Sequence, residues 1–128
     1  MKALLDTHVF LWAISEPERL SPRARRVIED PRTVRLVSVA SAWEILIKVR
    51  AKRLKLPENA AAFLRREISH IAAEVLDVRM EHVLRIYSLP ALHRDPFDRL
   101  LIAQSQVERV PLITADPLMA RYPVDIVW

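Results

Sequence analysis

Short apolar stretches alternate with longer stretches of helical periodicity along this chain. Runs rich in β-branched and aliphatic residues predict buried strands, at Lys2–Leu5, Val34–Val39, Glu74–Val78, Leu112–Thr114 and Val124–Val127. Apolar positions three or four residues apart predict helices between them, at Thr7–Ser15, Ser21–Asp30, Ala42–Lys52, Asn59–His70, Glu81–Ser88 and Phe97–Arg109. Strands that alternate with helices indicate an α/β fold, in which helices cover both faces of a mostly parallel sheet.

Polar residues at the predicted helix starts support this assignment. Thr7, Ser21 and Asn59 are good N-cap residues, and Ser41 caps or lies early in its helix. Asp116, which precedes a proline, is expected to open one more short helix after the fourth strand.

The length of 128 residues and the 52% hydrophobic content predict a single domain over residues 1–128 with a core of its own. The apolar stretches are shorter than the roughly 20 residues that a membrane span needs. The amino-terminal segment lacks the small-residue cleavage site of a signal peptide. A cytoplasmic protein is therefore expected, with no membrane partner, and the lack of cysteine excludes disulfides, thiolate chemistry and sulfur-based zinc sites.

The charge of the chain changes the picture more than its size does. The net charge is +4, and arginine supplies 16 of the 20 basic residues. Guanidinium groups bind phosphate well, so a nucleic-acid partner and a set of solvated helix faces explain these residues equally well. The complete absence of glycine excludes the phosphate-binding loops of P-loop nucleotide hydrolases and of dinucleotide-binding folds.

Four carboxylates fall at positions that a parallel sheet brings together. Asp6 ends the first strand and Asp116 follows the fourth, while Glu44 and Asp98 lie near the starts of the two helices Ala42–Lys52 and Phe97–Arg109. Ligands bind at the carboxyl ends of strands in open α/β sheets. Each acid also has an ordinary role: Asp116 as an N-cap, Asp98 beside a helix dipole, Glu44 paired with Lys48. Asp6 is the exception, since a buried, unpaired carboxylate is costly.

Taken together, the four acids predict a metal site. Carboxylates a few ångströms apart repel one another unless a cation lies between them. An oxygen-only ligand set suits Mg²⁺ or Mn²⁺, which can activate water and stabilise the leaving oxygen of a phosphodiester. An acidic site on an arginine-rich protein is what a metal-dependent nuclease needs.

Four motif blocks, in three stretches of sequence, resemble the PIN-domain ribonucleases of the VapC toxin type. The stretches are LLDTHVFLWA, SAWEILIKVRAKRLKL and LPALHRDPFDRLLIAQSQVERVPLITADPLMARYPV. They occur in the family's order and cover nearly the whole chain. Two positions depart from the family pattern, which often has glycine in the turn Ala51–Leu54 and at Val110. Both lie outside the acidic positions.

The resemblance implies a three-layer α/β/α fold and places the family's acidic quartet on Asp6, Glu44, Asp98 and Asp116. It further implies a divalent metal, endonucleolytic cleavage of RNA, a cognate VapB-like antitoxin and usually a homodimer. Two alternatives remain: a PIN-like nuclease that acts on other RNA or on DNA outside a toxin system, and a non-catalytic module that binds nucleic acid or protein. The presence of all four acids disfavours the second.

Other residues near the acids are weaker candidates. Thr114 and Ser41 can orient a metal-bound water or cap the local backbone, and Asp95 is twice as well explained by capping as by metal binding. Arg94 and Arg99 are the best candidates for contacts to RNA phosphates. His8 and His93 can shuttle protons, although packing or simple exposure explains a lone histidine better.

Large apolar side chains predict two further surfaces. Their number suggests an apolar homodimer interface. The first helix offers Phe10, Leu11 and Trp12 in succession, and the third and fourth helices add Trp43, Ile47, Phe63 and Leu64. A partner helix from the antitoxin can bury its apolar stripe there, with a basic side chain that reaches the carboxylates. The alternative is that these residues are core.

Overall fold

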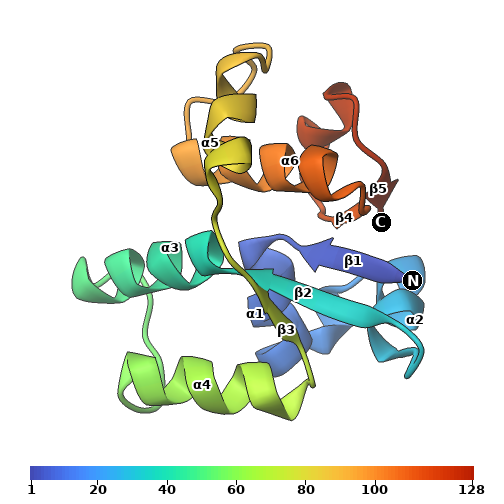
Figure 1. Ribbon diagram of the computed structural model, residues 1–128. Coiled ribbons are helices and arrows are strands. Elements are labelled where there is room, and N and C mark those ends of the chain that lie inside the picture. Colours follow the sequence, from blue (N-terminus) through green and yellow to red (C-terminus); the bar gives the residue numbers. More distant parts are fainter.

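The central sheet has five parallel strands in the order β3-β2-β1-β4-β5, in a computed structural model that describes residues 1–128 (Figure 1). The strands are β1 (Lys2–Leu5), β2 (Val34–Ser38), β3 (Glu74–Leu76), β4 (Leu112–Ile113) and β5 (Ile126–Val127). Leu4 pairs with Leu36 on one side and with Leu112 on the other, so β1 is the central strand. The predicted parallel sheet is confirmed, and every strand pair in it is parallel.

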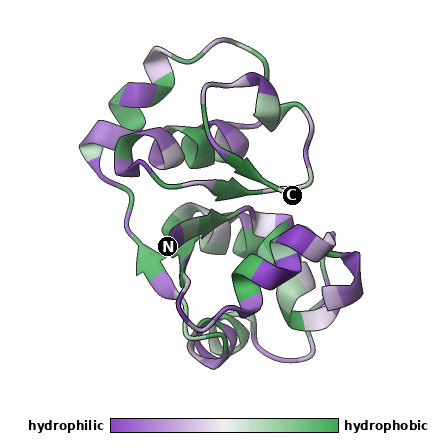
Figure 2. Ribbon diagram, turned by 90° about the vertical axis from the view of Figure 1, so that its right-hand side faces the viewer, coloured by the Kyte–Doolittle hydropathy of each residue, from purple (hydrophilic) through white to green (hydrophobic).

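Helices cover both faces of this sheet. They are α1 (Thr7–Ser15), α2 (Pro22–Glu29), α3 (Val39–Arg50), α4 (Ala60–His70), α5 (Met80–Tyr87) and α6 (Pro96–Glu108). Side chains of successive strand residues point to opposite faces. Leu5 accordingly packs in a cluster with residues of α1, α2 and α4, while Leu4 packs in a second cluster with α6. Figure 2 shows the apolar strands between these two helical layers, which confirms the α/β/α sandwich.

The element boundaries differ from the predicted ones in a consistent way. Helix α3 begins at Val39, because the Ser38 hydroxyl accepts the Ala40 N–H at 3.0 Å and caps the helix there. Ser41 therefore lies inside the helix. No helix opens at Asp116; its side chain accepts the Leu118 N–H, and only a 3-10 turn follows at Met119–Arg121. A second 3-10 turn at Pro17–Arg19 carries no hydrophobic periodicity and was not predicted.

Three helices end in a left-handed residue although the chain contains no glycine. Lys52, Ala72 and Arg109 have φ values of 59°, 52° and 56°, at the ends of α3, α4 and α6. This conformation costs a residue with a Cβ atom about 1–2 kcal/mol. Lys52 lies in the turn Ala51–Leu54, so this cost arises at one of the two departures from the family's glycine pattern, whereas at the other the left-handed residue is Arg109, the neighbour of Val110. None of the helices has the length and apolar character required to span a membrane.

Candidate active site

The sheet reverses its winding direction between β1 and β4, and two of the predicted acids follow these strands. The backbone N–H of Asp6 donates to the Ile113 carbonyl at 3.0 Å, which fixes the end of β1 against the end of β4. Asp116 follows β4 by three residues. Adjacent parallel strands that connect in opposite directions leave a crevice at their carboxyl ends. Asp6 and Asp116 therefore line one crevice, as the sequence predicted.

Thr114 holds these two residues in place. Its hydroxyl donates to Asp6 Oδ2 at 2.7 Å and accepts the backbone N–H of Asp116 at 3.1 Å. Asp6 is buried, and burial raises the pKa of its carboxyl above the usual range, although the bond from Thr114 acts in the opposite direction. Hydrogen bonds from the Thr114 side chain and the Thr7 backbone thus offset the effect of burial on the pKa of Asp6 only in part, and a cation near the carboxylate would stabilise its charge.

Glu44 contributes a third carboxylate from α3, and it is almost fully buried. Its Oε2 lies 2.9 Å from Lys48 Nζ, one turn further along the helix. Its Oε1 is buried and has no hydrogen-bond partner. Thr7 donates to the Ser41 hydroxyl at 2.8 Å, which fixes the start of α1 against the turn of α3 that carries Glu44. An unpartnered buried carboxylate oxygen is costly unless a cation approaches it.

Asp98, in the first turn of α6, carries the strongest sign of crowding. Its pKa is raised to about 7, first by burial, then by the charge of Asp95, with smaller contributions from Asp6 and Glu44. His93 acts in the opposite direction. Charges that influence one another in this way lie close together. Asp6, Glu44 and Asp98 therefore form one electrostatic cluster, and Asp116 lies beside Asp98 in the same pocket.

This cluster fits a hard divalent cation. All four acids offer oxygen ligands, which Mg²⁺ and Mn²⁺ prefer. A cation at this place would stabilise the ionised form of Asp98, whose pKa is raised mainly by burial, and would give the buried Oε1 of Glu44 a partner. His93, Asp98 and Asp116 additionally place one ligand atom each within 4.8 Å of one another.

A pocket of about 430 Å³ opens above the acids. Asp6, Asp98 and Asp116 line it, and the rest of the lining comes from His8, Trp12, Arg19 and Ala115. The Arg19 guanidinium lies over the Trp12 ring, 4.4 Å from its centroid. The sequence does not point to Arg19, because this residue lies on a short 3-10 turn that has no hydrophobic periodicity.

Two candidate residues serve the fold instead. The guanidinium of Arg99 donates to the carbonyls of Pro90 at 2.8 Å and Ile86 at 3.1 Å. These bonds tie α6 to the end of α5 and occupy donors of the guanidinium group. Asp95 caps α6 by accepting hydrogen bonds from the N–H groups of Phe97 and Asp98, which is the capping role that the sequence favoured. Arg94 is exposed beside the site and makes no ion pair.

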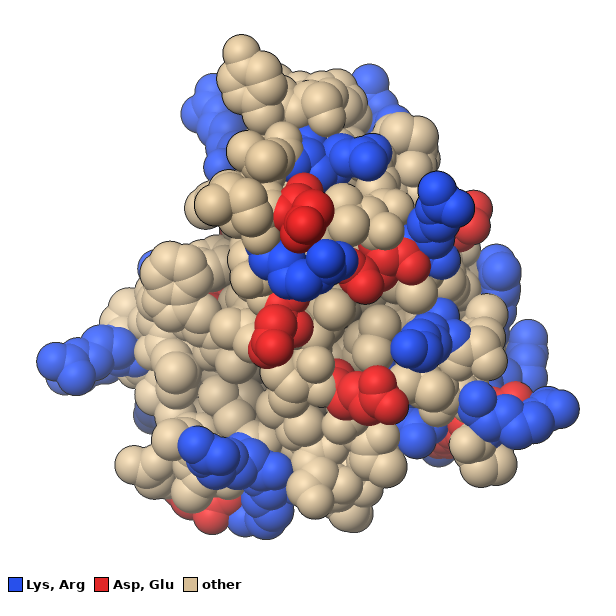
Figure 3. Space-filling model, in the orientation of Figure 1, with Lys and Arg blue, Asp and Glu red and all other residues tan.

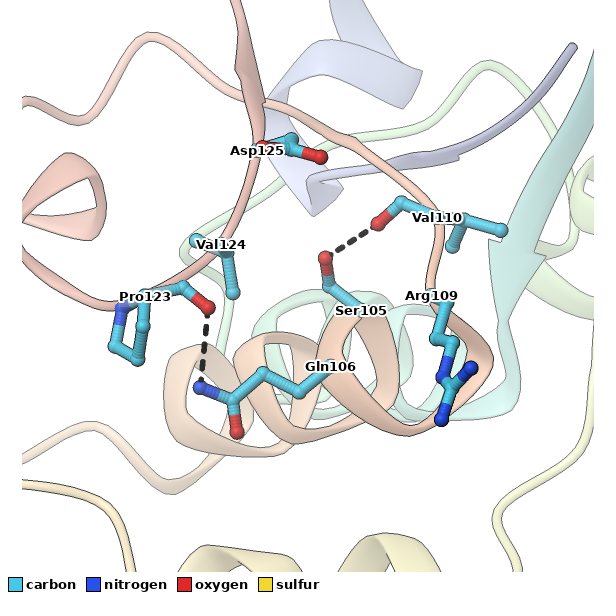
Figure 4. Close-up of a pocket in the computed structure, with 7 residues that line it drawn as sticks. All are labelled: Ser105, Gln106, Arg109, Val110, Pro123, Val124 and Asp125. Carbon is cyan, nitrogen blue, oxygen red and sulfur yellow. Dashed lines mark hydrogen bonds between the residues drawn. The ribbon is translucent and has the colours of Figure 1, made fainter.

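Another pocket, of about 410 Å³, lies at the opposite end of β4, between α6 and the segment that leads into β5 (Figure 4). Ser105 donates to the Val110 carbonyl at 2.6 Å and Gln106 to the Pro123 carbonyl at 3.4 Å. These side chains donate to backbone carbonyls of the pocket wall rather than into the pocket. The pocket is therefore not a candidate active site.

The raised pKa of Asp98 gives a prediction about stability. Its carboxyl keeps its proton to about pH 7 in the folded chain but loses it near 3.8 in the unfolded chain, so the metal-free fold binds more protons between these values. The free energy of unfolding should therefore fall, through this group, as the pH rises across that window. Thermal melts in a chelator should show a smaller decline for Asp98→Asn than for the wild-type chain. Identical pH profiles would contradict the raised pKa.

Comparison with known proteins agrees with this geometry. The PIN domain family matches residues 3–125. Ribonuclease VapC22 from Mycobacterium tuberculosis is 27% identical over 114 residues, which are 88% of this chain and 85% of that protein. The crystal structure of VapBC2 from Rickettsia felis, bound to a DNA fragment from their promoter, matches with a TM-score of 0.72 at 17% identity. The match covers 98% of this chain and 97% of that one. The resemblance seen in the sequence motifs is thereby confirmed.

Proposed function

Because the chain belongs to the PIN domain family, we propose that it is a Mg²⁺- or Mn²⁺-dependent endoribonuclease and the toxin of a VapBC-type pair. The observation that carries this proposal is the cluster of four carboxylates in one crevice, with a buried Glu44 oxygen that lacks a partner. The similarity to Ribonuclease VapC22 supports RNA as the substrate. The similarity to the VapBC2 structure supports a VapB-like antitoxin as the partner.

Asp6, Glu44, Asp98 and Asp116 would hold the ion. A divalent ion bound there would lower the pKa of the attacking water and stabilise the leaving oxygen of the phosphodiester. Thr114 orients Asp6 through the 2.7 Å bond. Ser41, through its bond with Thr7, holds the α3 turn that carries Glu44.

Arginine side chains would position the RNA. Arg19 lines the pocket beside the acids, and Arg94 is exposed on the loop that leads into α6. Guanidinium groups at the rim of an acidic pocket offset the repulsion between the carboxylates and the phosphates of the substrate.

The test is a cleavage assay with purified protein on a mixed RNA pool and on single-stranded DNA of the same sequence. We expect RNA fragments with Mg²⁺ or Mn²⁺, none with a chelator, and recovery when the ion is restored. Cleavage that survives chelation would overturn metal dependence, and cleavage of the DNA alone would favour a PIN-like nuclease of another kind.

A groove next to the active site fits the antitoxin. It has a volume of about 470 Å³ and shares His8, Trp12 and Arg19 with the catalytic pocket. Leu11, Leu54, Leu56 and Phe63 supply apolar lining. An amphipathic segment can bury its apolar side here while a basic side chain reaches the acids.

The groove corrects part of the predicted antitoxin surface. Phe10 is fully buried and Leu64 nearly so, and both belong to the core beside α1, α2 and α4. Trp43 and Ile47 are exposed, yet they do not line this groove. The predicted surface therefore divides into core residues, groove residues and a separate exposed patch.

Trp12→Ala should weaken binding of an antitoxin peptide, by more than about 1 kcal/mol if Trp12 is a hot spot. Trp43→Ala is the matched control, because it removes the same side chain from outside the groove and should leave the peptide affinity unchanged. Isothermal titration, run with thermal melts of both variants, separates lost binding from lost folding. A folded Trp12→Ala variant with wild-type affinity would remove α1 from the interface.

The exposed patch supports the expected homodimer. On α5 it comprises Met80, Val83, Leu84 and Tyr87, and on α3 it comprises Val39, Trp43, Leu46 and Ile47. The Trp43 ring packs edge-on against Phe97 at the start of α6, and α5 lies along α6, so the two helices border one side of the molecule (Figure 1). Figure 3 shows uncharged surface on this side of the molecule, interrupted by several charged side chains. We propose a second copy of the chain as its partner, because exposed apolar side chains gathered on two helices are typical of a homodimer interface.

A further inference from the structure

His93 lies in the loop before α6, and its side chain is only 6% exposed. Its ring stacks on that of Tyr122, with the centroids 5.4 Å apart. Tyr122 is buried in the core cluster against α6. The imidazole is thus held between a core residue and the acidic pocket, in contrast to His8, which is exposed on α1.

The hydrogen bonds around His93 fix which nitrogen carries its proton. Nε2 lies 2.9 Å from Asp116 Oδ2, and a carboxylate only accepts, so Nε2 donates. In the neutral ring Nδ1 is then an acceptor. Nδ1 lies 3.0 Å from the Tyr122 hydroxyl, which accepts the His93 backbone N–H on the same oxygen and gives its own proton to Nδ1. A continuous chain therefore runs from Tyr122 through His93 to Asp116.

Asp116 needs this support more than the other acids do. It lies on a turn rather than in a helix or strand, and its side chain is 35% exposed. The Leu118 N–H holds Oδ1 at 2.9 Å, and His93 holds Oδ2. With both bonds made, the Asp116 carboxylate cannot rotate, so its remaining lone pairs point in a fixed direction. Without His93, the carboxylate keeps a single bond and is free to rotate about it.

We propose that His93 is a positioning residue that is held in the Nε2–H tautomer by Tyr122 and aims Asp116 at the metal ion. This inference rests on the proposed function, because it assigns Asp116 to that ion. Partners that orient a ligand in this way set metal affinity, and their loss costs about 10–100-fold. In this arrangement His93 does not itself bind the ion, because its Nε2, which faces the site, donates to Asp116.

The test uses Tyr122→Phe, which keeps the ring stack and removes only the hydroxyl, and His93→Leu, which removes the donor to Asp116. His93→Gln is the rescue variant, because its amide can place an N–H near the Nε2 position. His70→Leu is the matched control for His93→Leu, since His70 is exposed at the end of α4, away from the acidic cluster. Mn²⁺ affinity is measured by titration calorimetry, and the tautomer of His93 by ¹⁵N NMR on the metal-free protein.

We expect the Nε2–H tautomer in the wild-type chain and a mixture of tautomers in Tyr122→Phe. The Mn²⁺ dissociation constant should rise about 10–100-fold in His93→Leu, less in Tyr122→Phe, and recover in part in His93→Gln. The KM for RNA should stay constant while kcat at limiting Mn²⁺ falls. Folded His93→Leu with wild-type Mn²⁺ affinity would overturn the inference, as would a direct nitrogen coupling to bound Mn²⁺ in electron spin-echo spectra.

These outcomes are separable from those of the proposed function. A wild-type chain that binds Mn²⁺ through this network but cleaves no RNA would overturn the proposed activity and support the positioning role. A chain that cleaves RNA with unchanged metal affinity in both variants would do the reverse. Absence of any Mn²⁺ binding by the wild-type chain would overturn both.

Discussion

Asp6→Asn should reduce RNA cleavage by at least about a thousandfold while the chain stays folded. The amide has the size of the carboxyl and still offers an oxygen to the Thr114 hydroxyl, which lies 2.7 Å from Oδ2 in the wild-type chain. It lacks the charge that a divalent ion needs. Burial already raises the pKa of Asp6, so the ionised acid destabilises the metal-free fold. The variant should therefore melt at the same temperature as the wild-type chain or higher in the presence of a chelator.

Asp125→Asn is the control for this experiment. Asp125 is exposed and lies beside the other pocket, at the far end of β4, so the same chemical change there should leave cleavage intact. Measured together, single-turnover cleavage and thermal melts with and without Mg²⁺ give a clear pattern. Mg²⁺ should raise the melting temperature of the wild-type chain and of Asp125→Asn but not of Asp6→Asn. Full activity of Asp6→Asn, in a preparation free of contaminating nuclease, would contradict the assignment of the acidic cluster as the active site.

Leu84→Arg should convert the proposed homodimer into a monomer. The Leu84 side chain is 64% exposed in the single chain, so the substitution costs the fold little. In a dimer the same change places two guanidinium groups in an apolar interface, where each pays a large desolvation penalty. A standard interface of about 800 Å² per partner does not tolerate this cost. Sedimentation velocity at tens of micromolar protein should therefore give half the mass of the wild-type species.

Ala61→Arg provides the matched comparison, because Ala61 is exposed on α4, on the other side of the sheet. That variant should remain dimeric. A wild-type chain that sediments as a monomer would contradict the proposed dimer directly, and a Leu84→Arg variant that remains dimeric would move the interface to another face.

The layers of the fold were predictable because each element carries its own period. Alternate positions of β1 pack on opposite faces, and the helices show apolar residues at every third or fourth position. Boundaries were less predictable where a polar side chain decides them. Ser38 starts α3 earlier than Ser41 would, and Asp116 uses its side chain to hold a turn instead of opening a helix. Both residue types suit either role, and only the surrounding chain selects one.

The acidic cluster was predictable in position but not in its supports. A strand-end acid such as Asp6 is conspicuous in sequence because burial makes it costly. The hydrogen bond from Thr114 connects residues far apart in the chain, and Tyr122 reaches His93 across the fold, so neither contact leaves a local pattern. The exposure of the apolar helix residues was equally hard to predict from the sequence. Phe63 and Trp43 both occupy apolar helix positions, yet one is buried and the other 60% exposed.

The bond between Thr114 and Asp6 spans 108 residues of sequence, so the cutting centre is among the last features to form. A ribosome that adds about 5–20 residues per second needs roughly 5–20 s between the synthesis of Asp6 and that of Thr114. Before β4 and Asp116 are made, the growing chain carries at most Asp6, Glu44 and Asp98, without the strand end that completes the crevice. Contacts so distant in sequence also form slowly after synthesis. The proposed ribonuclease would thus be inactive until nearly its whole length is translated, and an abortive fragment that stops before β4 would lack Thr114 and Asp116.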